Sequence, residues 1–183
     1  MFLFIISNGT DKLLLITFLF EFTGLQNANF VNVKITDHVK VSLPAEFSPM
    51  TDDDLAFKYP STKKPTAMYT DPDRLVDFGL NETRNNWPDN DLELLKKFYK
   101  SSMLYLYDTV SFIQEDVKMI NNRQFIVFEF VSGSIGKTIR GSARIRRTYS
   151  YIQYTIYEGK ILVFNFSCNA IFQSEWEQIA EII

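Results

Sequence analysis

Apolar positions in the last part of the chain predict four consecutive β-strands, over residues 110–120, 123–132, 143–157 and 160–168. These segments are rich in branched and aromatic residues, which favour the pleated surface of a sheet. Asn121-Asn122 separates the first two segments and Glu158-Gly159 the last two, and both pairs suit a tight two-residue turn. Because such turns join antiparallel strands, the pattern predicts a mostly antiparallel sheet.

The segment 124–132 carries apolar side chains on both of its faces. Alternate positions in a strand point to opposite sides of the sheet. One set holds Phe125, Val127 and Val131, and the other set holds Ile126, Phe128 and Phe130. A strand that is apolar on both faces needs cover on both faces, so we expect a sheet sandwiched between helices.

Three segments carry helix signals, each with a capping residue followed three positions later by an acidic residue. The capping pairs are Thr51 with Asp54, Asn90 with Glu93, and Ser174 with Glu177. A single strand region is predicted at 33–44 and a hairpin at 66–84, which makes the order β-α-β-β-α-β-β-β-β-α. The fold class is therefore α/β (α+β), an α/β/α sandwich around a mostly antiparallel sheet.

The first 28 residues differ in pattern from the rest of the chain. Lys12 precedes an apolar run at 13–20, and the small residue Ala28 ends a polar stretch. This is the layout of an export signal, and the run is well short of the ~20 residues that a membrane span needs. We expect residues 1–28 to be a signal peptide and residues 29–183 to be a single domain. The alternatives are an edge strand or a wrongly assigned start codon.

The composition of the chain indicates its cellular location and the class of its partner. Cys168 is the only cysteine, so no intramolecular disulfide can form, which suits a bacterial periplasmic or secreted protein better than a cross-linked eukaryotic module. The charges nearly balance, with 19 Lys and Arg against 22 Asp and Glu, and this argues against a nucleic-acid partner. We expect a monomer without a transmembrane span after removal of the signal, in contact with a protein or an envelope component.

A glycine-punctuated segment that ends in Gly136-Lys137-Thr138 suggests a phosphate-binding loop. The Walker A motif requires its first glycine at position 131, where this chain has Val131. The motif must also lead into a helix whose amides hold phosphate, whereas strand-forming residues follow here. We interpret the segment as the long loop of a β-hairpin.

The residues beside this loop are the candidate partner-binding site. Five cations and two nearby tyrosines make up the set: Lys137, Arg140, Arg144, Arg146, Arg147, Tyr149 and Tyr151. Arginine forks beside aromatic rings suit an anionic partner, such as a phosphate, a glycan carboxylate or an acidic protein face. The alternative is a solvated basic hairpin end whose tyrosines pack under a helix.

Catalytic, metal and cofactor residues are not indicated. The one histidine, His38, lies in the first strand region, and the strand pattern around Cys168 predicts a buried thiol, which is inert. The acidic residues 52–54 lack the spacing of a calcium loop and suit a helix start. Paired carboxylates remain open as a hydrolase site, because their geometry depends on the tertiary structure.

Several stretches carry a family resemblance over residues 33–183. They are "VSLPAEFSPMTDDDLAFKYPSTKKP", "VDFGLN", "LLKKFY", "QFIVFEF" and "YIQYTIYEGKILVFNFSC". With the element order, they make the chain similar to the Mog1/PsbP-like fold family, and to Bacteroidetes-type exported proteins related to it. Known members are a Ran-binding nuclear factor and a photosystem assembly subunit, so the resemblance implies a non-catalytic accessory protein.

Three functions follow as hypotheses. The first is an exported accessory protein that binds a protein or an envelope component. The second is a carrier of a small molecule or lipid, which needs an apolar cavity of several hundred cubic ångströms between sheet and helix. The third is a hydrolase with a carboxylate-based site.

Overall fold

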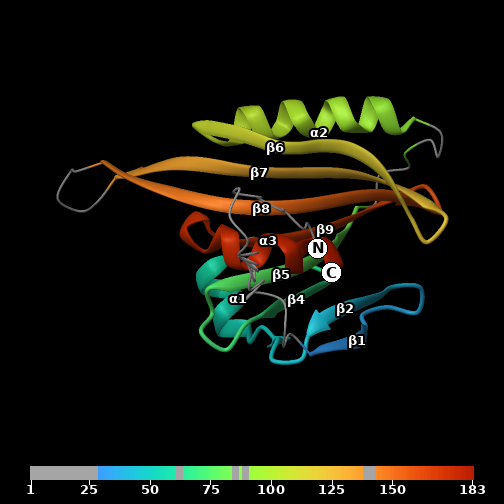
Figure 1. The fold of residues 1–183 in the computed structure, drawn as a ribbon, viewed down its shortest axis with the longest axis horizontal. Coiled ribbons are helices and arrows are strands. Elements are labelled where there is room, and N and C mark those ends of the chain that lie inside the picture. Colours follow the sequence, from blue (N-terminus) through green and yellow to red (C-terminus); the bar gives the residue numbers. More distant parts are fainter. Residues whose placement is uncertain (1–28, 61–63, 84–86, 88–90, 138–142) are drawn as a thin grey trace, which may run out of the picture.

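The large sheet of this protein is antiparallel, and the described residues form seven of its strands, in the order β3-β4-β5-β9-β8-β7-β6 (Figure 1). The computed structural model describes residues 29–60, 64–83, 87, 91–137 and 143–183. The strands are β3 (Ser48–Pro49), β4 (Ala67–Thr70), β5 (Val76–Glu82), β6 (Thr109–Ile120), β7 (Arg123–Lys137), β8 (Ala143–Tyr157) and β9 (Lys160–Asn169). The expected α/β sandwich around an antiparallel sheet is confirmed.

The predicted two-residue turns join the long strands. Asn121 and Asn122 have φ angles of 49° and 62°, and Glu158 and Gly159 have φ angles of 51° and 72°. Positive φ at both positions matches the twist of the flanking strands. These turns set the registers of β6 with β7 and of β8 with β9.

The helices are α1 (Asp52–Lys58), α2 (Leu92–Leu106) and α3 (Gln173–Ile182), and a short 3-10 helix, η1 (Ala170–Phe172), leads into α3. None of the helices in the described ranges is long and apolar enough to cross a membrane. Thr51 and Asp54 form the capping box predicted for α1.

One face of the sheet is covered by α3 and by a hairpin of β1 (Phe30–Lys34) and β2 (Lys40–Pro44). The ring centroid of Trp176 in α3 lies 5.7 Å from the ring centroid of Phe47 and 5.9 Å from that of Phe166. Val127 of β7 belongs to this core. We refer to this side as the α3 face.

The opposite face is covered by α2 and α1. Leu95 and Met103 of α2 pack on Ile126, Phe128 and Phe130 of β7. This confirms that β7 is buried on both of its faces. We refer to this side as the α2 face.

α1 lies on the α2 face as well. Its last residue, Lys58, bonds to Asp77 of β5, whereas the flanking Val76 and Phe78 belong to the core under α3. Neighbouring residues in a strand point to opposite sides, so α1 and α3 are on opposite sides of β5.

The N-terminal strand region differs from the prediction of one strand. Residues 33–44 bend between β1 and β2, which pair with each other as a separate two-stranded sheet. The Thr36 hydroxyl accepts hydrogen bonds from the amides of His38 and Val39, at 3.3 and 3.1 Å, and so stabilises the bend. His38 therefore lies in a turn, where its ring stacks on Tyr157.

Two predicted helix caps are also wrong. α2 is capped by Asp91, whose side chain accepts from the Leu94 amide at 3.2 Å, and not by the preceding asparagine, Asn90, which lies outside the described residues. Ser174 lies within α3, because η1 continues directly into that helix. The cap of this unit is Asn169, whose side chain accepts from the Ile171 amide.

β7 and β8 extend past the rest of the sheet as a two-stranded ribbon (Figure 1). β6 stops opposite Gly133 and β9 stops opposite Thr148, so residues 134–137 and 143–146 pair only with each other, and Arg147 pairs with Gly133 at the base of the extension. The strands thus continue where a loop was expected. Gly133 has a packing role in its strand, because a Cβ there would come within 2.4 Å of the Thr109 hydroxyl.

Candidate functional site: a polar cleft beside a basic ribbon

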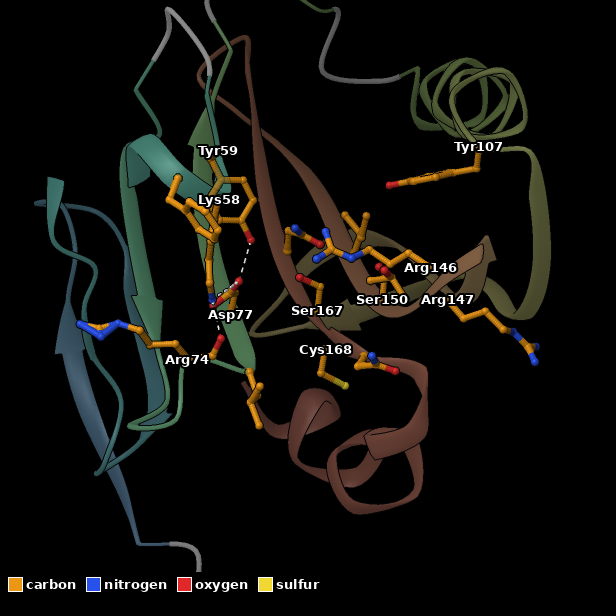
Figure 2. Close-up of a pocket in the computed structure, with 16 residues that line it drawn as sticks. Lys58, Tyr59, Arg74, Asp77, Tyr107, Arg146, Arg147, Ser150, Ser167 and Cys168 are labelled. Atoms are coloured by element: carbon orange, nitrogen blue, oxygen red, sulfur yellow. Dashed lines mark hydrogen bonds and ion pairs between the residues drawn. The ribbon is translucent and has the colours of Figure 1, made fainter. Parts of the chain in front are cut away.

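A cleft of about 530 Å³ opens on the α2 face, between α1 and the end of α2. Its floor is formed by β5, β9 and β8, and Figure 2 shows Tyr59 on one side and Tyr107 on the other. Polar side chains that line it include Lys58, Tyr59, Asp77, Tyr107, Arg146, Ser150, Asn165 and Ser167. We call this site the polar cleft.

Asp77 is the centre of a hydrogen-bonded group at the edge of the polar cleft. Its carboxylate accepts from Lys58 Nζ at 2.7 and 3.0 Å, from the Tyr59 hydroxyl at 2.9 Å and from the Thr70 hydroxyl at 2.8 Å. Lys58 Nζ also donates to the Arg74 carbonyl at 2.7 Å. A buried carboxylate requires such partners, because an unpaired buried charge is costly. The charges of Lys58 and Asp77 therefore offset each other.

Tyr59 links this group to the middle of the cleft. Burial raises the pKa of the Tyr59 hydroxyl above its usual value, and the negative charge and hydrogen bond of Asp77 raise this pKa further. A hydrogen bond with Ser167 and the positive charge of Arg146 act in the opposite direction. Tyr59 is therefore a neutral hydrogen-bonding group at neutral pH.

Arg146 and Arg147 point in opposite directions, as successive residues of a strand do. Figure 2 shows the Arg146 guanidinium reaching into the polar cleft and the Arg147 guanidinium turned away from it, while another part of Arg147 borders the cleft. Neither side chain forms an ion pair with another residue in the described part of the chain. Arg74, a third arginine at the cleft, pairs with Asp54 at 2.7 Å. Arg146 thus supplies the uncompensated charge inside the polar cleft.

The floor of the polar cleft also contains an unsatisfied acceptor. The side-chain oxygen of Asn165 is buried and has no hydrogen-bond donor in the described part of the protein. Asn165 is paired across the sheet with Ile152 of β8 and Gly79 of β5, and the next pair on this face is Ser150 with Ser167. Leaving such an acceptor unpaired costs about 1–3 kcal/mol, which a bound donor would recover.

Two of the predicted site residues are buried. Tyr149 and Tyr151 are 0% and 3% exposed and belong to the core under α3. Tyr149 also donates a hydrogen bond to Glu129 at 3.0 Å. A contact with a partner needs exposed rings, so this part of the predicted site is corrected: the two tyrosines pack beneath a helix.

The predicted cations are placed along the basic ribbon, the two-stranded extension at 134–137 and 143–147. Lys137 and Arg144 lie on its strands, opposite Ala143 and Gly136, and Arg140 lies outside the described residues. The ribbon also exposes an apolar cross-strand pair, Ile135 and Ile145, at 56% and 63%.

The described residues offer little for nucleophilic or metal chemistry. Cys168 is buried as predicted, and burial raises the pKa of its thiol to about 12, so the thiolate nucleophile is not formed at neutral pH. Asp52 pairs with Lys64, and the Asp54 carboxylate accepts hydrogen bonds from the amide and hydroxyl of Thr51 in the capping box of α1. No group of three His, Cys, Asp or Glu side chains within the described ranges is arranged to hold a metal ion.

The polar cleft was missed by reasoning from sequence, although a signal was present. Asp77, Ser150, Asn165 and Ser167 are polar residues inside otherwise apolar strands, and all fall at the positions that face α2. Polar side chains that share one face of neighbouring strands indicate a gap in the cover of that face. Their meeting required the strand order β5-β9-β8, which the local pattern does not contain.

Comparison with a solved structure supports the fold described above. No protein-family model and no curated protein sequence matches the chain. The solution structure of cyanobacterial PsbP (CyanoP) from Synechocystis sp. PCC 6803 is similar, with a TM-score of 0.50, 11% identity, and coverage of 86% of this chain and 91% of that one. A Pseudomonas aeruginosa protein of unknown function, PA94, has a TM-score of 0.46 and 6% identity, with coverage of 83% and 91%. The chain has a PsbP-like fold.

Proposed function

We propose that this chain with a PsbP-like fold is a non-catalytic accessory protein, which binds a protein or envelope component through the basic ribbon. The observation that carries the proposal is the ribbon itself, a two-stranded extension beyond the sheet with exposed isoleucines and with Arg147, which has no ion-pair partner among the described residues. Ile135, Ile145 and Arg147 share the face of the ribbon that is turned away from the polar cleft, and this face is the proposed contact surface.

The chemistry of the ribbon suits an acidic partner surface. Ile135 and Ile145 offer apolar area that a partner can cover, and Arg147 offers a guanidinium that has no described ion-pair partner. Arginine beside exposed apolar area is typical of interface cores, and complementary charge speeds association. The protein as a whole has a formal net charge of −3, so the ribbon is a local positive site on an acidic molecule.

Export belongs to the same proposal. The layout of residues 1–28 supports a signal peptide, and a periplasmic or secreted location brings the ribbon into contact with envelope components. N-terminal sequencing of the protein recovered from the cell envelope checks this, and a chain that begins at Met1 contradicts cleavage.

The main experiment is quantitative recovery of partners from an envelope extract with the tagged protein. Arg147→Glu reverses a ribbon charge that is turned away from the polar cleft, and Lys97→Glu reverses an exposed charge on α2 as a matched control. We expect Arg147→Glu to reduce recovery of a specific partner about ten-fold, because like charges then face each other. Lys97→Glu should recover as much as the unmodified protein, and equal recovery by all three excludes the ribbon as the contact site.

The two alternative functions find different support. A lipid carrier needs an apolar cavity, whereas the polar cleft has the necessary volume but a polar floor, which favours a small polar ligand. For a carboxylate hydrolase, the described carboxyl with a raised pKa is that of Glu129. It lies on the other face of the sheet from the polar cleft and is hydrogen-bonded to the buried Tyr149.

A further inference from the structure

We infer that the polar cleft is a binding site for a small organic anion. Arg146 holds the anionic group of this ligand, and the side-chain oxygen of Asn165 accepts a hydrogen bond from a donor group of the ligand. The inference is independent of the ribbon as a partner surface, because it rests on the side of β8 that faces α2. It assigns a ligand class to a site that sequence reasoning did not identify.

The balance of charge defines the first requirement for the ligand. Lys58 is neutralised by Asp77, and Arg74 is engaged by Asp54. Arg146 is left with a guanidinium directed into the cleft and no described ion-pair partner. A guanidinium presents a planar fork of donors that matches a carboxylate or a phosphate, so a single anionic group completes this end of the site.

The unsatisfied oxygen of Asn165 defines the second requirement. It is buried in the floor of the cleft with no described donor, whereas Ser167 interacts with Tyr59. A ligand hydroxyl or amide N–H that donates to this oxygen would remove the cost of an unpaired buried acceptor. The ligand therefore carries a donor at some distance from its anionic group.

The walls of the cleft define the third requirement. Tyr59 and Tyr107 stand on its two sides (Figure 2), and Phe57 at the rim is 88% exposed. Aromatic side chains around a polar floor suit a flat or ring-containing body between the two polar ends. The volume of about 530 Å³ is within the range of roughly 300–1,000 Å³ that small-molecule sites occupy.

The experiment uses the full chain with isotope-labelled side-chain amides and two ring-containing anions. The probe 4-hydroxybenzoate carries a carboxylate and a hydroxyl, and phenyl phosphate tests the phosphate form of the same anionic end. Benzyl alcohol and inorganic phosphate are the controls for the ring alone and for charge alone. We expect at least one ring-containing anion to bind saturably with a Kd below about 1 mM and to shift the side-chain amide resonances of Asn165.

Matched variants locate the site. Arg146→Gln should weaken binding of the anion about ten-fold or more, because it removes the charged fork. Arg147→Gln is the control, since the neighbouring side chain points away from the cleft. Asn165→Ala should weaken 4-hydroxybenzoate more than benzoate, which lacks the donor.

Three outcomes overturn the inference. One is the absence of saturable binding by both ring-containing anions. Another is equal binding by the Arg146→Gln and Arg147→Gln variants, which places the anion elsewhere. The last is inorganic phosphate binding as tightly as the organic anions, which shows that the site recognises charge without an organic ligand. None of these outcomes contradicts the proposed function. That function is tested by charge reversal at Arg147, whereas the cleft is tested by changes at Arg146 and Asn165.

Discussion

The two faces of the central sheet are built from the same strands but are covered to different extents. On the α3 face, α3 and the β1–β2 hairpin bury the strands, and Tyr149 is fully enclosed there. On the α2 face, α1 and α2 stand apart and leave the polar cleft between them. Side chains of β8 alternate between these two environments. Arg146 and Ser150 line the polar cleft, whereas Tyr149 and Tyr151 are buried in the core under α3.

The difference teaches that one strand can serve packing and binding at once. Side chains in a strand alternate in direction, so substitutions one residue apart should affect different properties of the protein. Changes on the α3 face should alter stability, and changes in the polar cleft should alter binding.

Truncation of Tyr149 is the strongest test of this contrast. Tyr149→Ala removes a fully buried ring and should lower the free energy of unfolding by about 3–5 kcal/mol, as for other large aromatic residues in cores. Ser150→Ala, at the next position and on the cleft side, should change it by less than about 1 kcal/mol. Urea unfolding of both variants provides the measurement. Similar losses in the two variants would show that the faces are packed alike.

Removal of Asp77 should give the next largest effect and is a test of the cleft wall. Asp77→Ala leaves Lys58 without its carboxylate and removes the acceptor for Tyr59. We expect a loss of about 2 kcal/mol, less than for a fully buried pair because Lys58 retains some exposure. Lys64→Ala, which removes an exposed pair with Asp52, is the control and should cost under about 1 kcal/mol.

The two faces also contain carboxylates whose pKa values shift in opposite directions. On the α3 face, burial raises the pKa of Glu129, and the charges of Glu181 and Glu177 add to this rise. On the α2 side, the hydrogen bond from Lys100 and its charge hold the pKa of Glu115 below its usual value.

These shifts predict opposite dependence of stability on pH. A carboxyl with a raised pKa favours the fold while protonated, so the contribution of Glu129 is lost as the pH rises from the unfolded value of about 4.5 through its folded pKa. The contribution of Glu115 is present above 4.5 and is lost as the pH falls through its folded pKa. Unfolding free energies measured between roughly pH 4 and pH 7 should show that Glu129→Gln is as stable as the unmodified protein at neutral pH, or more stable. Glu115→Gln should be less stable there, and the opposite order would contradict the assigned directions.

The smallest effect on stability is expected for the ribbon arginines. Arg146→Ala and Arg147→Ala remove exposed side chains without described ion-pair partners, so each should change the free energy of unfolding by less than about 0.5 kcal/mol. Thermal unfolding checks this. A larger loss in either variant would mean that its arginine stabilises the fold instead of remaining available to a ligand or partner.

Much of the fold follows from patterns that neighbouring residues share. The Asn121-Asn122 and Glu158-Gly159 turns, the capping box of α1 and the double-sided burial of β7 were all predicted correctly. These features depend on local backbone angles and on the alternation of side-chain direction along one strand. Both can be predicted from a short stretch of sequence. The cap of α3 was missed, because η1 enters that helix from a preceding turn that the pattern does not indicate.

By itself, the sequence determined the four long strands β6 to β9, their hairpin turns, the need for cover on both faces and the cluster of cations at the β7–β8 hairpin. Only the tertiary structure decided that the guanidinium groups of Arg146 and Arg147 point to different surfaces, and that Tyr149 and Tyr151 are enclosed. It also decided that Lys58 and Asp77 meet Asn165 across a cleft, through the pairing of β5 with β9 and of β9 with β8. The reason is physical: strand order and the gap between two helices arise from packing between distant segments, which no local periodicity specifies.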